Sequence, residues 1–90
     1  MKNYSVEYTS QAEKELSKID EKTNAIIRRW IEKNLDGCEN PRLYGKALHG
    51  KLSNKWRYRV GDYRIISDIQ DDKIVILIVN IAHRSKVYNK

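Results

Sequence analysis

The stretch that decides the fold lies in the second half of the chain and reads Trp56-Arg57-Tyr58-Arg59-Val60-Gly61-Asp62-Tyr63-Arg64-Ile65. Apolar and basic side chains alternate from residue 56 to residue 60, and this period of two is typical of a strand with two different faces. Gly61 and Asp62 favour a tight turn, after which residues 63–69 resume a strand pattern. We therefore predict a β-hairpin with one apolar face and one basic face.

Two helices are predicted before this hairpin. Ser10 and Glu13 have the spacing of a capping box, which opens a helix with one apolar face. Asp20 is a favourable cap for a second helix, and Gly37 is a favourable residue to end it. The apolar residues expected to face the core are Ala12, Leu16, Ile19, Ile27, Ile31 and Leu35, with Trp30 beside them.

Strand patterns also lie near both ends of the chain. Residues 3–9 alternate between polar and apolar side chains, whereas residues 74–81 are almost all apolar, as in a central strand covered on both faces. Residues 38–54 contain one proline and two glycines and are predicted to be an irregular connector. The order β-α-α-β-β-β predicts an α+β fold of one domain over residues 1–90, with a helical hairpin on one face of a twisted antiparallel sheet.

Positive charge is concentrated in one segment. The 90 residues contain 18 Lys and Arg against 12 Asp and Glu, a net charge of +6. Residues 41–64 contain seven basic residues and one acidic residue, so this segment accounts for the whole excess. Such a patch attracts polyanions, whereas a surface selected only for solubility would tolerate the same charge spread over the chain.

The sequence also argues against several classes of protein. The single cysteine, Cys38, excludes an internal disulfide and a zinc site built from cysteines. The longest apolar run, residues 74–79, is far shorter than the roughly 20 residues of a transmembrane helix, and the first residues lack the apolar core of a signal peptide. Neither metal-ligand spacing nor a Gly-rich phosphate loop is present. We expect a cytoplasmic protein without a cofactor, a metal site or a membrane partner.

The basic strand face is the strongest candidate site. Lys55, Arg57 and Arg59 recur at every second residue, and Arg64 can join them from the next strand. Like charges this close repel one another, and a phosphate among them relieves the repulsion because guanidinium groups bind it through two hydrogen bonds. The alternative is a solvated face on which acidic neighbours pair with the cations.

Three further candidates follow the predicted central strand. Histidine is the one side chain that, unperturbed, titrates near neutrality, so His83 is a candidate general acid or base. Arg84 is a candidate phosphate clamp, and Tyr88 offers a hydroxyl group or a surface on which a base can stack. A lone histidine at a strand end is more often structural, and its place beside a basic cluster favours the functional interpretation.

Three features of the sequence together resemble the RelE family of bacterial and archaeal toxins. They are the stretch Leu48-His49-Gly50, the hairpin at residues 56–65, and the ending Ala82-His83-Arg84-Ser85-Lys86-Val87-Tyr88. The Gly-Asp-Tyr-Arg-Ile turn is shared with the wider RelE/ParE superfamily, whereas the His-Arg…Val-Tyr ending is more specific to its RNA-cleaving branch. The resemblance covers essentially the whole chain.

This resemblance implies a toxin of a type II toxin–antitoxin system that cleaves mRNA in the ribosomal A site without a metal. In that reaction the 2′-OH attacks the adjacent phosphate and yields a 2′,3′-cyclic phosphate and a 5′-OH. An acidic, RelB-like antitoxin encoded by the adjacent gene is expected to neutralise the toxin.

The functional residues of the family fall on Arg57, Arg59, Arg64, Arg84 and Tyr88. The best-known member has lysines at the first two positions, and arginine is too basic to accept a proton readily, so His83 is the candidate acid or base. The arginines would then stabilise the pentacovalent phosphorane. Contacts with RNA or the ribosome are expected from Arg42, Lys46, His49, Lys51 and Lys55.

Two alternatives share this predicted fold. A ParE-like toxin would poison DNA gyrase by protein–protein contact, and a simple binding module would use the basic face on RNA without cutting it. Arg84 and Tyr88 discriminate between these functions, because they are needed for cleavage and irrelevant to gyrase binding.

Overall fold

The predicted hairpin is the centre of the sheet. In the computed structural model, which describes residues 3–48 and 55–85, β3 (Trp56–Val60) pairs antiparallel with β4 (Tyr63–Gln70). Gly61 and Asp62 form the two-residue turn, and Gly61 has a φ of +59°, a conformation that costs glycine little. The next strand, β5 (Val75–His83), pairs antiparallel with β4. The three strands form the predicted meander.

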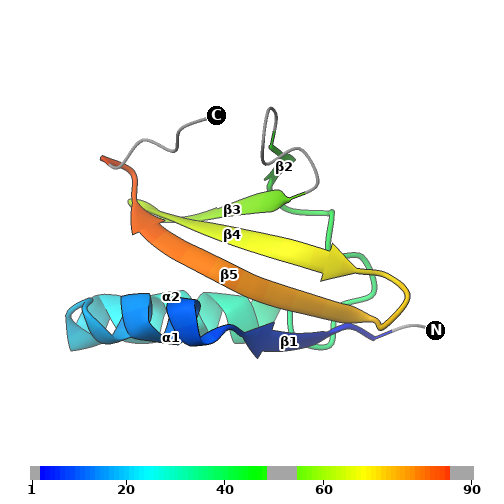
Figure 1. The fold of residues 1–90 in the computed structure, drawn as a ribbon, viewed down its shortest axis with the longest axis horizontal. Coiled ribbons are helices and arrows are strands. Elements are labelled where there is room, and N and C mark those ends of the chain that lie inside the picture. Colours follow the sequence, from blue (N-terminus) through cyan, green and yellow to red (C-terminus); the bar gives the residue numbers. More distant parts are fainter. Residues whose placement is uncertain (1–2, 49–54, 86–90) are drawn as a thin grey trace.

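Two helices cover one face of this sheet (Figure 1). They are α1 (Ser10–Ser17) and α2 (Glu21–Asn34), which follow β1 (Ser5–Tyr8). A two-residue strand, β2 (Lys46–Ala47), lies inside the predicted connector and pairs with β3. The predicted α+β class and element order are therefore confirmed, with β2 as the one addition.

The sheet order is β1-β5-β4-β3-β2, and β1 runs parallel to β5. The sheet is therefore mixed, and the prediction of a wholly antiparallel sheet is wrong for this pair. The two helices return the chain to the start of β1, where the Gly37 N–H donates to the Tyr4 carbonyl oxygen over 2.7 Å. The strands β3, β4 and β5 then follow in alternating directions, and β5 runs in the same direction as β1.

The core lies between the helices and the sheet. Ala12 and Leu16 of α1 and Ile27 and Ile31 of α2 are fully buried, as their spacing predicted. They pack against the apolar residues of β3, β4 and β5, which are Tyr58, Val60, Ile65, Ile76, Ile78 and Ile81. No helix of the described ranges covers the opposite face of the sheet (Figure 1), and no helix there is long and apolar enough to cross a membrane.

A break in pairing decides which residues of β5 face the helices. Ile66 pairs with Asn80 and Ser67 pairs with Ile78, so the register skips Val79. One extra residue in a strand shifts the side-chain alternation beyond it by one position. Ile81 consequently joins the helix-facing core, and Ala82 turns to the opposite face, where it lies in register with Arg64.

The cap of α1 lies one residue earlier than predicted. Thr9, not Ser10, is the N-cap residue, and its Oγ1 accepts a hydrogen bond from the Ala12 N–H over 3.0 Å. Thr9 still has extended backbone geometry and its hydroxyl also donates to the Val79 carbonyl oxygen over 3.3 Å, so one side chain joins the helix start to the bulged strand. The predicted Asp20 cap of α2 is confirmed by its bond to the Thr23 N–H.

Candidate functional site

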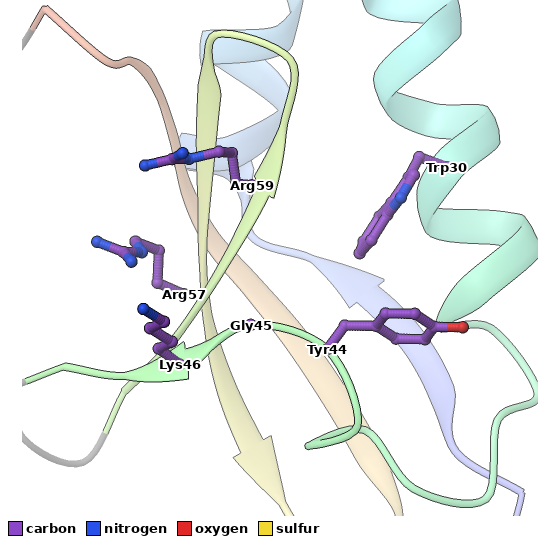
Figure 2. A pocket seen from close by; sticks show the side chains of 6 residues that line it. All are labelled: Trp30, Tyr44, Gly45, Lys46, Arg57 and Arg59. Atoms are coloured by element: carbon purple, nitrogen blue, oxygen red, sulfur yellow. The ribbon is translucent and has the colours of Figure 1, made fainter.

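Four basic side chains lie on the face of the sheet that the helices leave open. Arg57 and Arg59 alternate with buried residues of β3, and Arg64 of β4 lies directly opposite Arg59. Lys46 of β2 lies directly opposite Arg57. Cross-strand partners share a face of the sheet, so these four residues form one cluster, which we call the basic face. Figure 2 shows Lys46, Arg57 and Arg59 directed to the same side of β3, away from Trp30.

The basic face has no acidic counterpart within residues 3–48 and 55–85. The three ion pairs described there use Arg28, Arg42 and Arg84 instead. The Nε atom of Arg64 is buried and has no hydrogen-bond partner in the described structure. Like charges directly across a strand pair destabilise it, and a buried donor without a partner is rare. Both features are relieved by an anion that binds at this face.

Arg84 lies at the turn of the hairpin rather than within the basic face. Its backbone N–H donates to the Asp62 carbonyl oxygen over 2.7 Å, which holds the end of β5 beside the turn. Its guanidinium Nε is 3.6 Å from the Asp62 carboxylate, and 70% of its side chain is exposed. An exposed ion pair at this distance contributes little stability. Arg84 can therefore release Asp62 and bind another anion at little cost.

Arg42 does not join this cluster. Its guanidinium group makes two hydrogen bonds, of 3.1 and 2.9 Å, to the Asp71 carboxylate in the β4–β5 turn. Tyr4 donates its hydroxyl to the same carboxylate over 2.6 Å, and this bond raises the pKa of Tyr4. The structure therefore gives Arg42 a structural contact near the far end of β4, which the sequence-based expectation of an RNA contact did not foresee.

His83 lies on the other side of the sheet from the arginines. It is in register with Tyr63, and their ring centroids are 5.3 Å apart in an edge-to-face arrangement. On that side, His83 lines a pocket of about 390 Å³ together with Lys14 and Lys18 of α1. The bulge at Val79 produces this placement. The structure thus brings Arg57, Arg59 and Arg64 together and leaves His83 apart from them.

The hydrogen bonds of His83 fix the role of one ring nitrogen. Nδ1 lies 3.1 Å from the backbone nitrogen of Ser85 and 2.9 Å from its hydroxyl oxygen. A backbone N–H can only donate, so Nδ1 is the acceptor and the ring proton is on Nε2. His83 in this structure orients the segment that follows β5.

Four of the predicted site residues cannot be placed on the basic face. His49, Lys51 and Tyr88 lie outside the described residues, and their roles stay predictions. Lys55 precedes β3, where its carbonyl oxygen accepts a hydrogen bond from the Leu48 N–H over 3.1 Å. Its predicted contact with RNA also stays a prediction.

A pocket beside the basic face was not predicted from the sequence. It has a volume of about 330 Å³ and is lined by Trp30, Tyr44, Gly45, Lys46, Arg57 and Arg59 (Figure 2). Trp30 contacts Tyr44 edge-to-face at 5.7 Å between ring centroids. The apolar pattern of the second helix placed Trp30 beside the core. Tyr44 and Gly45 belong to the irregular connector, which has no periodic pattern from which a contact can be predicted.

The remaining chemistry of the described residues is limited. No group of three or more His, Cys, Asp or Glu residues there is arranged to hold a metal ion. Burial raises the pKa of the Cys38 thiol, which disfavours the reactive thiolate. The arrangement that remains is a fixed set of cations suited to a phosphodiester backbone.

Comparison with known proteins identifies the family. The family model for the "ParE toxin of type II toxin-antitoxin system, parDE" matches residues 6–88. The toxin RelE of Mycobacterium tuberculosis is 33% identical over 94% of this chain and 86% of its own length. The mRNA interferase toxin RelE of Escherichia coli is 26% identical over 97% of this chain and 92% of its own length.

A solved structure gives the same result. A chain of the toxin–antitoxin complex RelBE2 from Mycobacterium tuberculosis superposes with a TM-score of 0.84 and 27% identity, and the match covers 96% of this chain and 97% of that one. The chain therefore belongs to the RelE/ParE family of toxins of type II toxin–antitoxin systems.

Proposed function

We propose that this toxin is a ribosome-dependent mRNA endonuclease that acts in the cytoplasm and inhibits translation. The observation that carries the proposal is the pairing of Arg59 with Arg64 across the hairpin, with Lys46 and Arg57 beside them and no acidic partner in the described chain. An anion would relieve the repulsion within this cluster, and RNA supplies a phosphodiester in every nucleotide. A relative named mRNA interferase supports the same chemistry.

The proposed reaction is an attack of a ribose 2′-OH on the adjacent phosphate. A bond forms between the 2′ oxygen and phosphorus, the bond from phosphorus to the 5′ oxygen breaks, and the products are a 2′,3′-cyclic phosphate and a 5′-OH. One proton leaves the 2′-OH and one is delivered to the 5′ oxygen, so no metal or cofactor is required. Negative charge rises on the phosphorane, where fixed cations contribute most.

Each arginine has a part in this proposal. Arg59 and Arg64 contact the non-bridging oxygens of the scissile phosphate, because they lie directly opposite one another across the hairpin. Arg57 and Lys46 contact a neighbouring phosphate, and Arg84 clamps the RNA at the turn after releasing Asp62. The proton-transfer roles predicted for His83 and Tyr88 stay predictions. A role for His83 in proton transfer requires its ring to leave Ser85 and cross to the other face.

The test is cleavage of mRNA on programmed ribosomes by the purified toxin, with mapping of the new 5′ ends. We expect cuts at fixed positions in the A-site codon, and we expect none with free mRNA. Arg64→Ala should abolish these cuts. Arg29→Ala is the matched control, because it removes an equal charge from the exposed surface of α2. Intact mRNA with the unaltered toxin, or equal loss in both variants, contradicts the proposal.

A second candidate function comes from the family model, which describes ParE toxins. In that case the target is DNA gyrase, and the toxin causes DNA breaks while mRNA remains intact. Induction of the toxin in cells, followed by parallel mapping of mRNA 5′ ends and DNA breaks, separates these functions.

The proposed partner is an acidic, RelB-like antitoxin encoded beside this gene. Solved relatives are toxin–antitoxin complexes, including RelBE2 of Mycobacterium tuberculosis and RelBE of Escherichia coli. Opposite charge on the antitoxin would accelerate its encounter with the basic face. The association rate should therefore fall steeply as salt rises, because the Debye length is only roughly 10 Å at 0.1 M. A salt-independent association rate would place the first contact elsewhere.

A further inference from the structure

The pocket of about 330 Å³ beside the basic face is lined from both sides of the sheet. Trp30 and Tyr44 lie on the side of the helices, and we call them the aromatic wall. Lys46, Arg57 and Arg59 belong to the basic face and form the basic wall (Figure 2). Only a site at the edge of a sheet can be lined in this way. The edge is that of β3, because β2 pairs with only the first two residues of this strand.

Gly45 places its two neighbours in the chain on different walls. Its φ is +81°, a conformation that costs glycine less than other residues. A Cβ at this position would collide with the Arg57 carbonyl oxygen, so the chain passes β3 here without a side chain. Tyr44 lies in the aromatic wall, and Lys46 lies in the basic wall. One short segment of backbone therefore joins the two walls.

The ring of Tyr44 is exposed and yet held in place. It belongs to a residue that is 39% exposed, which is high for a large aromatic residue beside a core. The Tyr44 carbonyl oxygen accepts a hydrogen bond from the Trp56 Nε1–H over 2.6 Å, and the ring lies edge-to-face with Trp30. Trp30 in turn contacts the buried Tyr58, with ring centroids 5.8 Å apart. A ring held in this way has little conformational freedom left to lose when a ligand stacks on it.

The backbone of β3 offers two further groups between the walls. Because backbone groups alternate in direction along a strand and β2 pairs with Arg57, Arg59 directs its N–H and C=O to the same edge. The pairing of β2 ends at Arg57, so these two groups of Arg59 have no strand partner among the described residues. One donor and one acceptor are thus available beside the aromatic wall.

An aromatic surface next to fixed cations matches the chemistry of a nucleotide. Proteins bind unpaired RNA bases by stacking them on aromatic side chains and by hydrogen bonds to the edges of the bases. Arginine and lysine bind the phosphate that is attached to such a base. A phosphate alone, or an apolar group alone, would use only one of the two walls.

We propose that the pocket binds one unpaired base of the RNA, stacked on Tyr44, with the phosphate of that nucleotide on the basic wall. The identity of the ligand rests on the proposed function, in which Lys46 and Arg57 contact the phosphate next to the scissile one. The base in the pocket then belongs to a nucleotide beside the cleavage site. Purines stack more strongly than pyrimidines, so a purine at this position favours cleavage. The pocket thereby contributes to the choice of the codon that is cut.

The first test is single-turnover cleavage on ribosomes programmed with A-site codons that differ in one base. We expect one position at which a purine gives faster cleavage than a pyrimidine. Tyr44→Leu keeps apolar bulk without a ring, so it should remove this preference and lower the rate on the purine codons by roughly tenfold, as expected when one stacking contact is lost. Tyr44→Phe keeps the ring and should keep the preference.

Leu43→Ala is the matched control for this test. Leu43 is 70% exposed in the same connector and does not line the pocket. Its removal should change neither the cleavage rate nor the base preference. A preference that survives in Tyr44→Leu, or an active toxin without any purine preference, overturns the proposal.

A binding measurement separates the pocket from the reaction. The probes are a short 2′-O-methyl oligoadenylate, which lacks the attacking hydroxyl groups, and the same sugar–phosphate chain without bases. Trp30 and Trp56 are the two tryptophans of the chain and both lie at the pocket, so tryptophan fluorescence reports binding. We expect the oligoadenylate to bind roughly tenfold more tightly than the chain without bases, and we expect Tyr44→Leu to bind both equally. Equal binding of both probes by the unaltered toxin contradicts the proposal.

Each remaining outcome has one meaning. Base-dependent binding by a toxin that does not cleave mRNA supports the pocket and is a failure of the proposed function. Cleavage without base preference and without base-dependent binding is a failure of the pocket alone. If adenosine monophosphate binds more tightly than the oligoadenylate, a free nucleotide is the ligand and the proposal is overturned. It is also overturned if Tyr44→Leu weakens only the binding of the protein encoded beside this gene, because the aromatic wall is then a protein contact.

Discussion

The two faces of β3 are built from alternate residues of one short stretch, and they follow different physical rules. Tyr58 is fully buried against the helices, with its ring centroid 5.8 Å from that of Trp30 and its hydroxyl donating to the Pro41 carbonyl oxygen. Arg59, the next residue, lies on the open face opposite Arg64. One face is arranged for burial and the other tolerates repulsion between like charges. The even-numbered residues of β3 therefore contribute to stability, and the odd-numbered residues are available to bind a ligand.

The largest effect is expected on the buried face. Tyr58→Ala removes a large side chain with no exposed surface and should lower the free energy of unfolding by about 3–5 kcal/mol, the usual cost for a large aromatic residue. Burial raises the pKa of Tyr58, so its hydroxyl remains a donor at every physiological pH. Urea denaturation monitored by tryptophan fluorescence measures the effect.

A milder variant sharpens this result. Tyr58→Phe keeps the ring and removes only the bond to Pro41, so we expect a loss of about 1–2 kcal/mol, because a buried acceptor is left without its partner. A Tyr58→Ala protein as stable as the unaltered one would show that the helix-facing side of β3 does not carry the core.

The open face should respond in the opposite way. Arg59→Ala should lower the rate of mRNA cleavage by roughly 10²–10³-fold, the usual loss when one electrostatic group at a developing oxyanion is removed. The same change removes a repulsion with Arg64, so the free energy of unfolding should stay the same or rise slightly, and the rise should shrink at high salt. Single-turnover cleavage and urea denaturation of the same preparation provide both values. If Arg59→Ala lowered both the free energy of unfolding and the cleavage rate, the two faces of β3 would not have separate roles.

Most of this organisation can be predicted from the sequence, but some of its long-range features cannot. Alternation in residues 56–60 and the Gly61 turn predicted the hairpin and its basic face, because these signals are local. The parallel pairing of β1 with β5 depends on where two helices return the chain, which no local pattern records. The contact of Arg42 with Asp71 likewise joins residues from two irregular segments.

The placement of His83 shows the limit most clearly. Strict alternation from Ile76 and Ile78 would direct His83 to the open face, together with the arginines. The skipped pairing of Val79 reverses this, and Val79 sits in an uninterrupted apolar run without a glycine or polar residue to signal a bulge. The side chains that fix the bulge come from elsewhere, since Thr9 binds the Val79 carbonyl oxygen and the Glu15 carboxylate accepts from the Ile81 N–H over 2.7 Å.

A pair of variants tests whether His83 acts through position or through proton transfer. In His83→Asn, the amide oxygen can replace Nδ1 as the acceptor for the Ser85 N–H, whereas in His83→Gln it lies closer to the place of Nε2. If His83 only orients the segment after β5, the Asn variant should retain most of the cleavage rate and the Gln variant should lose more. Loss of general acid–base catalysis would instead lower both by roughly 10²–10⁴-fold.

The pH profile of the same reaction separates these roles further. A positioning role predicts that the Asn variant keeps the profile of the unaltered toxin. If the Asn variant instead loses an ionisation near neutral pH that the unaltered toxin shows, His83 takes part in proton transfer and must reach the basic face during the reaction.

The smallest effect concerns the start of α1, in the layer that covers the buried face. Thr9→Ala removes the cap on the Ala12 N–H and the bond to the Val79 carbonyl oxygen, so the free energy of unfolding should fall by about 1 kcal/mol, the usual worth of an N-cap residue. Ser10→Ala should change it by less than about 0.5 kcal/mol, as is usual for surface substitutions. The capping box at Ser10 predicts the reverse order, so urea denaturation of this pair decides between the two caps. Thr9→Ala should not affect the open face, so the cleavage rate of this variant should match that of the unaltered toxin. The cap supports only the helix layer. The Glu15 carboxylate still accepts from the Ile81 N–H, so the bulge in β5 should keep its register.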